Sequence, residues 1–155
     1  MMKIISIFSI VLVILFNSCS GSDTEKSLTL KTGKYNYTLT DSAGTILVEG
    51  EMMFDKITKQ KENPDHMVSG SYTIKTMTTD TSYQGFSTMS GGELSGYYSD
   101  EKKFLNINTN PKIADANVFI NVTVKSSLLE GSWYYSTFRG MDKEGGFFKA
   151  TRIKK

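Results

Sequence analysis

The strongest constraint on the fold is a five-residue pattern that occurs four times: an aliphatic residue, a polar residue, glycine, any residue, then methionine or an aromatic residue. The copies are 48–52 (VEGEM), 68–72 (VSGSY), 94–98 (LSGYY) and 129–133 (LEGSW). In a β-strand the first, third and fifth positions face the same side, so each glycine lies on the apolar face between two larger side chains. Glycine there is typical of a strand that coils sharply or approaches another backbone closely. The pattern therefore predicts a strongly curved sheet that closes on itself.

Alternation of apolar and polar residues with a period of two extends through most of the chain. Tyr35, Tyr37 and Leu39 alternate with polar residues, and the turn DSAG leads directly into a second apolar run, which predicts a β-hairpin. Turn signals, among them Asn63-Pro64-Asp65 and Gly145-Gly146, separate the later segments. Those segments predict strands at 67–78, 92–99, 103–109, 117–125, 128–138 and 146–153.

These segments predict an all-β domain of about eight strands. We expect an antiparallel up-and-down barrel, because closure removes the exposed edge strands that would otherwise pair with neighbouring molecules. An open β-sandwich, in which the repeated glycines mark β-bulges, is the alternative.

The N-terminal region differs in composition from the rest of the chain. A start of Met1-Met2-Lys3 precedes a largely apolar segment over residues 4–16. That segment is shorter than the about 20 residues that cross a bilayer as a helix, and it has the length of the apolar part of a secretory signal. The only cysteine, Cys19, follows it closely and has no second cysteine with which to form an internal disulfide.

Phe16-Asn17-Ser18-Cys19 resembles the bacterial lipoprotein signal, in which a cysteine after a small residue receives a diacylglycerol and becomes the mature N-terminus. The resemblance implies a signal peptide at 1–18, a lipidated Cys19 with a flexible tether over 19–27, and a barrel domain at 28–155. The mature protein would then contact the membrane through the lipid on Cys19. An ordinary secretory signal, in which Cys19 is incidental, is the alternative.

Residue 20 bears on the location that this resemblance implies. Ser20 rather than Asp follows the cysteine. In Gram-negative lipoproteins an Asp at that position often retains the protein at the inner membrane, so the resemblance implies the outer membrane. The resemblance does not decide between the periplasmic face and the cell-surface face of that membrane.

A second resemblance concerns the C-terminal part of the chain. Gly131-Ser132-Trp133 resembles the Gly-x-Trp motif of the lipocalin and avidin-like barrels, the calycin group. In that group the Trp closes one barrel end and an Arg from the last strand packs across it, which implies this role for Arg152. Lipocalins carry the Trp on their first strand, whereas Trp133 lies on the penultimate one. We therefore transfer no ligand residue and expect Trp133 and Arg152 to have structural roles.

The interior of an eight-stranded barrel is either filled by side chains or holds one small ligand. Four large side chains with a polar atom are expected to point inward: Tyr72, Tyr98, Trp133 and Tyr135. Their rings would line the interior, and their polar atoms would orient a mostly apolar guest. We predict a binding module for a small apolar or amphipathic ligand, with these four as its ligand-binding residues.

The alternative is a protein-interaction, inhibitor or envelope-structural role that uses the loops or the outer wall. Tyr83, Phe86 and Met89 lie in a Gly-flanked segment and are expected to form an exposed apolar patch for a protein partner.

Other classes of function have little support in the sequence. His66 is the only histidine, and no nucleophile and base set or phosphate-binding loop is present, so we predict no enzyme activity, catalytic residue, metal site or cofactor. The net charge is only +2, from 18 Lys plus Arg against 16 Asp plus Glu, and no long run has a single sign. That balance does not indicate a nucleic-acid partner.

Overall fold

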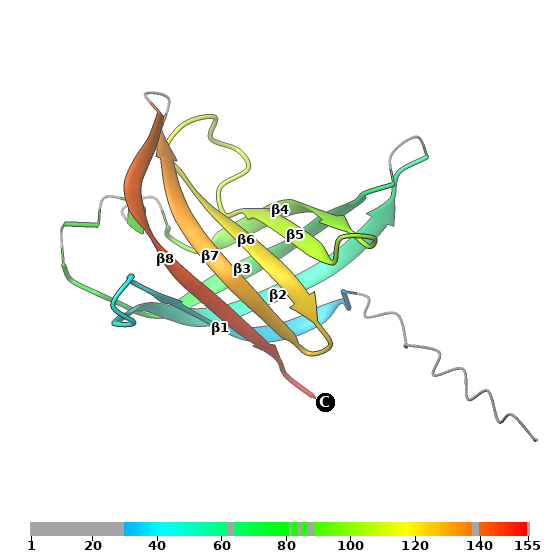
Figure 1. Cartoon of the computed structure of the whole chain (residues 1–155), viewed down its shortest axis with the longest axis horizontal. Helices are drawn as coiled ribbons and strands as arrows, with labels where there is room; N and C mark the ends of the chain where they lie inside the picture. The colour runs from blue at the N-terminus through cyan, green and yellow to red at the C-terminus, as the bar shows by residue number, and fades with distance from the viewer. Residues whose placement is uncertain are drawn as a thin grey trace, which may run out of the picture.

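The computed structural model describes residues 30–61, 64–80, 82–83, 85–86, 89–137 and 140–154. Within them, eight antiparallel strands pair in chain order, and β1 pairs with both β2 and β8, which closes the barrel (Figure 1). The strands are β1 (Gly33–Thr40), β2 (Ile46–Lys59), β3 (His66–Met77), β4 (Gly92–Ser99), β5 (Phe104–Asn108), β6 (Asn117–Lys125), β7 (Leu128–Thr137) and β8 (Gly140–Arg152). The predicted up-and-down barrel is confirmed, and the open sandwich is wrong. Cys19, the segment 1–18 and the segment 19–27 lie outside the described residues.

The repeated glycines allow neighbouring strands to approach closely, as the pattern predicts. A Cβ added at any of them would overlap a backbone carbonyl oxygen of the adjacent strand. The pairs of glycine and carbonyl residue are Gly50 with Thr73, Gly70 with Met53, Gly96 with Asn106, and Gly131 with Asn121. The space left by each missing side chain is therefore filled by backbone, which lets the sheet coil but leaves no room there for a ligand.

The predicted turn at Gly145-Gly146 is wrong. β8 begins at Gly140 and runs through both glycines, with Gly146 opposite Trp133 on β7. A Cβ on Gly146 would overlap the carbonyl oxygen of Thr40 and meet the Trp133 indole nitrogen at 2.9 Å. This glycine pair thus permits a close approach of backbones inside a strand. The bounds of the other predicted strands agree with the observed bounds to within about two residues.

The barrel has two ends that differ in the segments that cover them. The loop end carries the β1–β2 turn at 41–45, the β3–β4 loop at 78–91 and the β5–β6 loop at 109–116. The termini end carries residues 30–32, where the described chain enters β1, the β2–β3 loop, the β4–β5 turn, the β6–β7 turn at 126–127 and residues 153–154 after β8 (Figure 1). Sites on the molecule can be placed by reference to these two ends.

The β3–β4 loop covers the loop end with apolar side chains. Phe86 is 3% exposed and lies against Trp133, with 5.0 Å between ring centroids, and Met89 is also buried. The backbone N–H of Gly85 donates to Glu144 Oε2 at 2.9 Å, which fixes the loop to β8. The expectation that Phe86 and Met89 belong to an exposed patch is therefore wrong, because this loop folds back onto the core; Tyr83 is partly buried against it.

The termini end is closed by the segment that leads into β1. Leu30 is buried, and its backbone hydrogen-bonds the hydroxyl of Tyr98, a side chain with no exposed surface. The Tyr35 hydroxyl donates to the Lys31 carbonyl at 2.8 Å. Between the two ends the interior holds fully buried aliphatic and aromatic side chains, among them Leu39, Val48, Val68, Leu105, Ile107, Ile120, Leu129 and Phe148.

Candidate ligand-binding site

The four predicted ligand-binding side chains all point into the barrel, but they do not share one site. Tyr72, Trp133 and Tyr135 lie toward the loop end, whereas Tyr98 lies at the termini end. The Trp133 indole N–H donates to the Thr40 carbonyl at 2.8 Å, so its polar atom already has a protein partner. Ligand binding by these four residues stays a prediction, and only three of them lie in the same half of the barrel.

Tyr98 forms a local pair at the termini end. Its hydroxyl donates to Asp100 Oδ1 at 2.9 Å, and the Lys103 ammonium lies 3.3 Å from the same oxygen. Burial, assisted by this hydrogen bond, raises the pKa of Tyr98 to about 12. The same hydrogen bond, followed by Lys103, lowers the pKa of the Asp100 carboxyl. The pair holds the β4–β5 turn in place, which is a structural use of the hydroxyl.

Tyr72 is the one member of the predicted set that lines a described cleft at the loop end. The cleft measures about 300 Å³ and is formed by Gly91, Glu93, Thr109 and Lys112, among others. Burial raises the pKa of the Tyr72 hydroxyl, while hydrogen bonds with Thr109 and the Gly91 backbone oppose that rise. The lining is mainly polar, and Lys112 pairs with Glu93 at 2.9 Å. This cleft therefore suits water or a small polar solute better than an apolar guest.

Arg152 does not pack across Trp133, contrary to what the calycin resemblance implies. Trp133 pairs with Gly146, whereas Arg152 lies six positions further along β8, opposite Tyr35 on β1. Six strand positions correspond to about 20 Å. Trp133 and Arg152 thus lie in different halves of the barrel, and Arg152 helps to form a cleft at the termini end.

The termini-end cleft has a volume of about 550 Å³ and is lined by Gly33, Lys34, Met53, Arg152, Ile153 and Lys154. The cleft forms because of the way β1 pairs with β2 and β8. Lys34 lies opposite Met53, and the Ile153 N–H donates to the Lys34 carbonyl at 2.9 Å. Gly33, at a φ of 122°, adopts a backbone conformation that side chains rarely allow. A Cβ there would meet the Arg152 guanidinium at 3.4 Å, so glycine also leaves room for that group.

The chemistry of the termini-end cleft is amphipathic. Met53 and Ile153 supply apolar surface, and Lys34, Arg152 and Lys154 supply positive charge. The Arg152 Nη2 donates to the Thr32 carbonyl at 2.9 Å, whereas its Nε is buried without a hydrogen-bond partner. No carboxylate is among the lining residues, and within the described residues none lies within 4.0 Å of these three cations.

Arg152 at the termini end interacts electrostatically with the buried Tyr35 hydroxyl. Burial raises the pKa of Tyr35, and the nearby Arg152 charge opposes that rise. The guanidinium therefore contributes a positive potential at the barrel mouth, and Glu51 and Asp55 line an adjacent hollow that shares Lys34 and Met53 with the cleft. An anionic group placed in the cleft would meet this potential directly.

Sequence reasoning missed this cleft because its parts come from both ends of the domain. Gly33 and Lys34 begin β1, whereas Arg152 and Lys154 end the chain, and only the closure of β1 on β8 brings them together. The available signal was weak: cations at the N-terminal end of one strand and the C-terminal end of another become neighbours when those strands pair antiparallel.

Two further observations concern the described part of the chain only. No three side chains among its His, Cys, Asp and Glu residues gather in a way that would hold a metal ion. Nor does it contain a helix long and apolar enough to cross a membrane.

Comparison of the chain with protein-family models, with curated proteins and with solved structures gave no match. The functional argument therefore depends on the sequence and on the geometry described above.

Proposed function

We propose that this protein is a lipid-anchored, non-enzymatic lipoprotein of the bacterial outer membrane that binds a small amphipathic ligand carrying a negative charge. The anchor is the lipid on Cys19, for which the sequence around that residue is the support. The ligand site is the termini-end cleft rather than the barrel interior, whose described part is occupied by side chains.

One observation carries the proposed binding function: apolar and cationic side chains share one cleft, and none of its described lining residues is a carboxylate. Met53 and Ile153 offer the surface that an alkyl chain prefers, and Arg152 offers hydrogen-bond donors for an oxyanion. The cleft volume of about 550 Å³ falls within the range of small-molecule sites, roughly 300–1,000 Å³. Charge-assisted hydrogen bonds are stronger than neutral ones, so an anionic head group would fix the ligand's orientation.

Calorimetric titration with dodecyl phosphate, below the concentration at which it forms micelles, tests this function. Dodecanol and inorganic phosphate serve as half-ligands, and both should bind more weakly than the complete amphiphile. Replacing Lys34 and Lys154 by Gln should weaken dodecyl phosphate binding by about two- to thirtyfold, because exposed charge pairs contribute roughly 0.2–1 kcal/mol each. Equal affinity in the parent and in K34Q/K154Q would place the ligand elsewhere.

A control variant with the same loss of charge separates the cleft from the overall charge. Lys75 and Lys112 lie outside the cleft and are exposed, with side-chain exposures of 57% and 74%. K75Q/K112Q should bind dodecyl phosphate as the parent does, and the same weakening in both double variants would contradict a localised site.

A further inference from the structure

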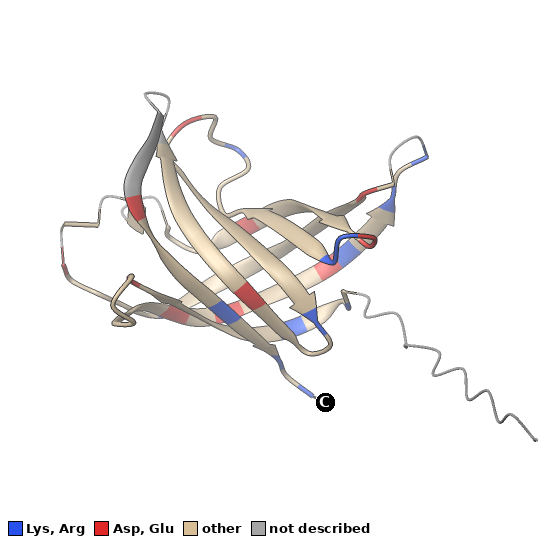
Figure 2. Ribbon diagram, in the orientation of Figure 1, with Lys and Arg blue, Asp and Glu red and all other residues tan. Residues whose placement is uncertain are grey.

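Cationic side chains are concentrated at the termini end of the barrel. Among the described residues its cations are Lys31, Lys34, Lys56, Lys59, Lys61, Lys102, Lys103, Lys125, Arg152 and Lys154, and its acids are Asp55, Asp65, Asp100, Glu101 and Glu130. The loop end has the opposite balance among the residues whose side chains the structure describes, with Asp41, Asp80, Glu93, Asp115 and Glu144 against Lys112. Figure 2 shows blue segments gathering at the end where β1 begins and the C-terminus lies. The near-neutral total charge thus conceals a molecule with one positive end.

Ion pairing increases the difference in charge between the termini end and the rest of the barrel. Away from the termini end, Lys75, Lys112 and Lys149 each pair with a glutamate. At the termini end only Lys103 and Lys125 form such pairs among the described residues. Most cations there therefore have no ion-pair partner within 4.0 Å among the described residues, and Lys34 interacts at longer range with the Glu51 carboxyl, whose pKa it helps to lower.

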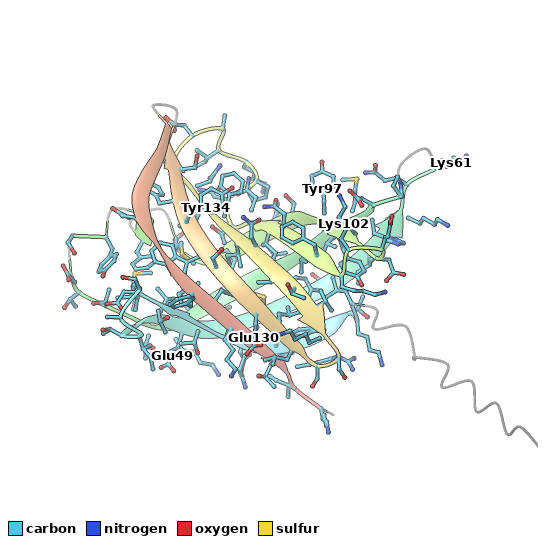
Figure 3. The ribbon with its side chains drawn as sticks, in the orientation of Figure 1. Glu49, Lys61, Tyr97, Lys102, Glu130 and Tyr134 are labelled. Atoms are coloured by element: carbon cyan, nitrogen blue, oxygen red, sulfur yellow. The ribbon has the colours of Figure 1, made fainter. Side chains whose placement is uncertain are left out.

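Exposed apolar side chains lie toward the same end on the wall formed by β3, β4 and β5, across the barrel from the termini-end cleft. Met67 lies opposite Tyr97, and Phe104 lies diagonally across from Tyr97 on β5. Their exposures are 47%, 53% and 39%. Figure 3 shows Tyr97 with Lys61 and Lys102 at the same end of the barrel. Aromatic rings next to lysines are typical of surfaces that enter the head-group region of a bilayer.

The position of the chain entry agrees with such a surface. Leu30, the first described residue, is packed into the termini end. The segment from Cys19 to Leu30 spans at most about 40 Å when fully extended. A lipid on Cys19, as in the proposed function on which this step depends, would therefore keep the termini end within about 40 Å of the bilayer.

We infer that the termini end docks on an anionic phospholipid bilayer, with a phospholipid head group in the termini-end cleft and Tyr97 at the lipid interface. The positive end faces the anionic head groups, and the acidic loop end, with its capping β3–β4 loop, faces away from them. The anchor and the docking surface act together, because a tethered domain meets the surface at a high local concentration.

Vesicle co-sedimentation of the unlipidated chain from Ser20 onward tests the docking without the anchor. This chain contains all eight strands and every described contact. It should bind vesicles of phosphatidylcholine with phosphatidylglycerol and not vesicles of phosphatidylcholine alone. Each lysine near the surface contributes about a fivefold factor, so K34Q/K102Q/K154Q should lower partitioning by about a hundredfold.

The matched control removes the same charge elsewhere. K75Q/K112Q/K149Q should lower partitioning by less than about threefold, since these lysines lie on the wall or at the loop end. Equal loss in the two triple variants, or equal binding to both vesicle types, would overturn the proposed docking.

Orientation is tested with the lipidated chain in vesicles that contain brominated acyl chains. A tryptophan introduced by Tyr97→Trp should be quenched, and one introduced by Ile46→Trp, at the loop end and 55% exposed, should not. Quenching of both or of neither would overturn the orientation. Dodecyl phosphate binding without vesicle docking would retain the proposed function and reject this inference. Docking without dodecyl phosphate binding would reject the ligand site, and with it the head group in the cleft, and would retain only the docking of the termini end.

Discussion

A substitution of Gly131 by alanine tests the physical basis of the closed barrel. The added Cβ would lie 2.8 Å from the Val122 Cα and 2.9 Å from the Asn121 carbonyl carbon, and it would overlap the Asn121 carbonyl oxygen. These are backbone atoms of β6, which cannot rotate away as a side chain can. β6 and β7 must therefore separate by more than half an ångström to restore ordinary contact.

The size of the effect follows from this geometry. Overpacking in a well-packed core typically costs 1–3 kcal/mol, and a clash with backbone belongs at the top of that range, at about 3 kcal/mol. For a domain of this size, each kcal/mol lowers the unfolding temperature by roughly 3–4 °C, so we expect a decrease of about 10 °C. Native stabilities of roughly 5–15 kcal/mol mean that the variant still folds and can be measured.

Thermal unfolding followed by circular dichroism measures this effect against two controls. Ser132→Ala, on the exposed side of the same strand, should change the free energy of unfolding by less than about 0.5 kcal/mol. Gly44→Ala places a Cβ where no atom lies within 4 Å but where φ is 89°, so it should cost about 1–2 kcal/mol from backbone strain alone. A Gly131→Ala variant as stable as Ser132→Ala would refute the close approach of β6 and β7.

Three further predictions concern the interior and its two ends. Trp133→Phe removes the donor to the Thr40 carbonyl and should lower the free energy of unfolding by about 2 kcal/mol in chemical denaturation; an unchanged midpoint would show that this hydrogen bond contributes nothing. Phe86→Ala should cost about 3 kcal/mol and increase binding of a hydrophobic dye, because it opens the cap over Trp133, whereas unaltered dye binding would mean that the cap is not needed for closure. The folded state raises the pKa of Tyr98 to about 12, so the neutral hydroxyl contributes to the free energy of unfolding. This contribution should be complete below about pH 10 and should be lost as the pH rises toward 12. A Tyr98→Phe variant with the same alkaline unfolding profile would argue against it.

The architecture was predictable because it depends on local pattern. Period-two alternation identified the strands, and the inward glycines indicated strands that coil closely enough to close a barrel. The glycine pair before Phe147 was misread as a turn, since a glycine that permits close approach and a glycine that permits a turn look alike in sequence. Only the partner strand distinguishes the two cases.

The candidate site was harder to predict because it depends on contacts between distant parts of the chain. Loops usually cover the surface, so the segment with Phe86 and Met89 was expected to be exposed, but it folds back against Trp133 on β7. The termini-end cleft needs the β1–β8 register, which places Lys34 beside Ile153. The inward direction of Tyr72 and Tyr98 followed from alternation, whereas their positions at opposite ends did not.

Native mass spectrometry of the protein purified in mild detergent from the membranes of its own host tests the central claim most directly. We expect a chain that begins at Cys19, carries acyl mass on that residue, and retains an anionic amphiphile that K34Q/K154Q releases. A mature chain that begins elsewhere, without acyl mass and without a bound small molecule, would contradict both the anchor and the ligand site.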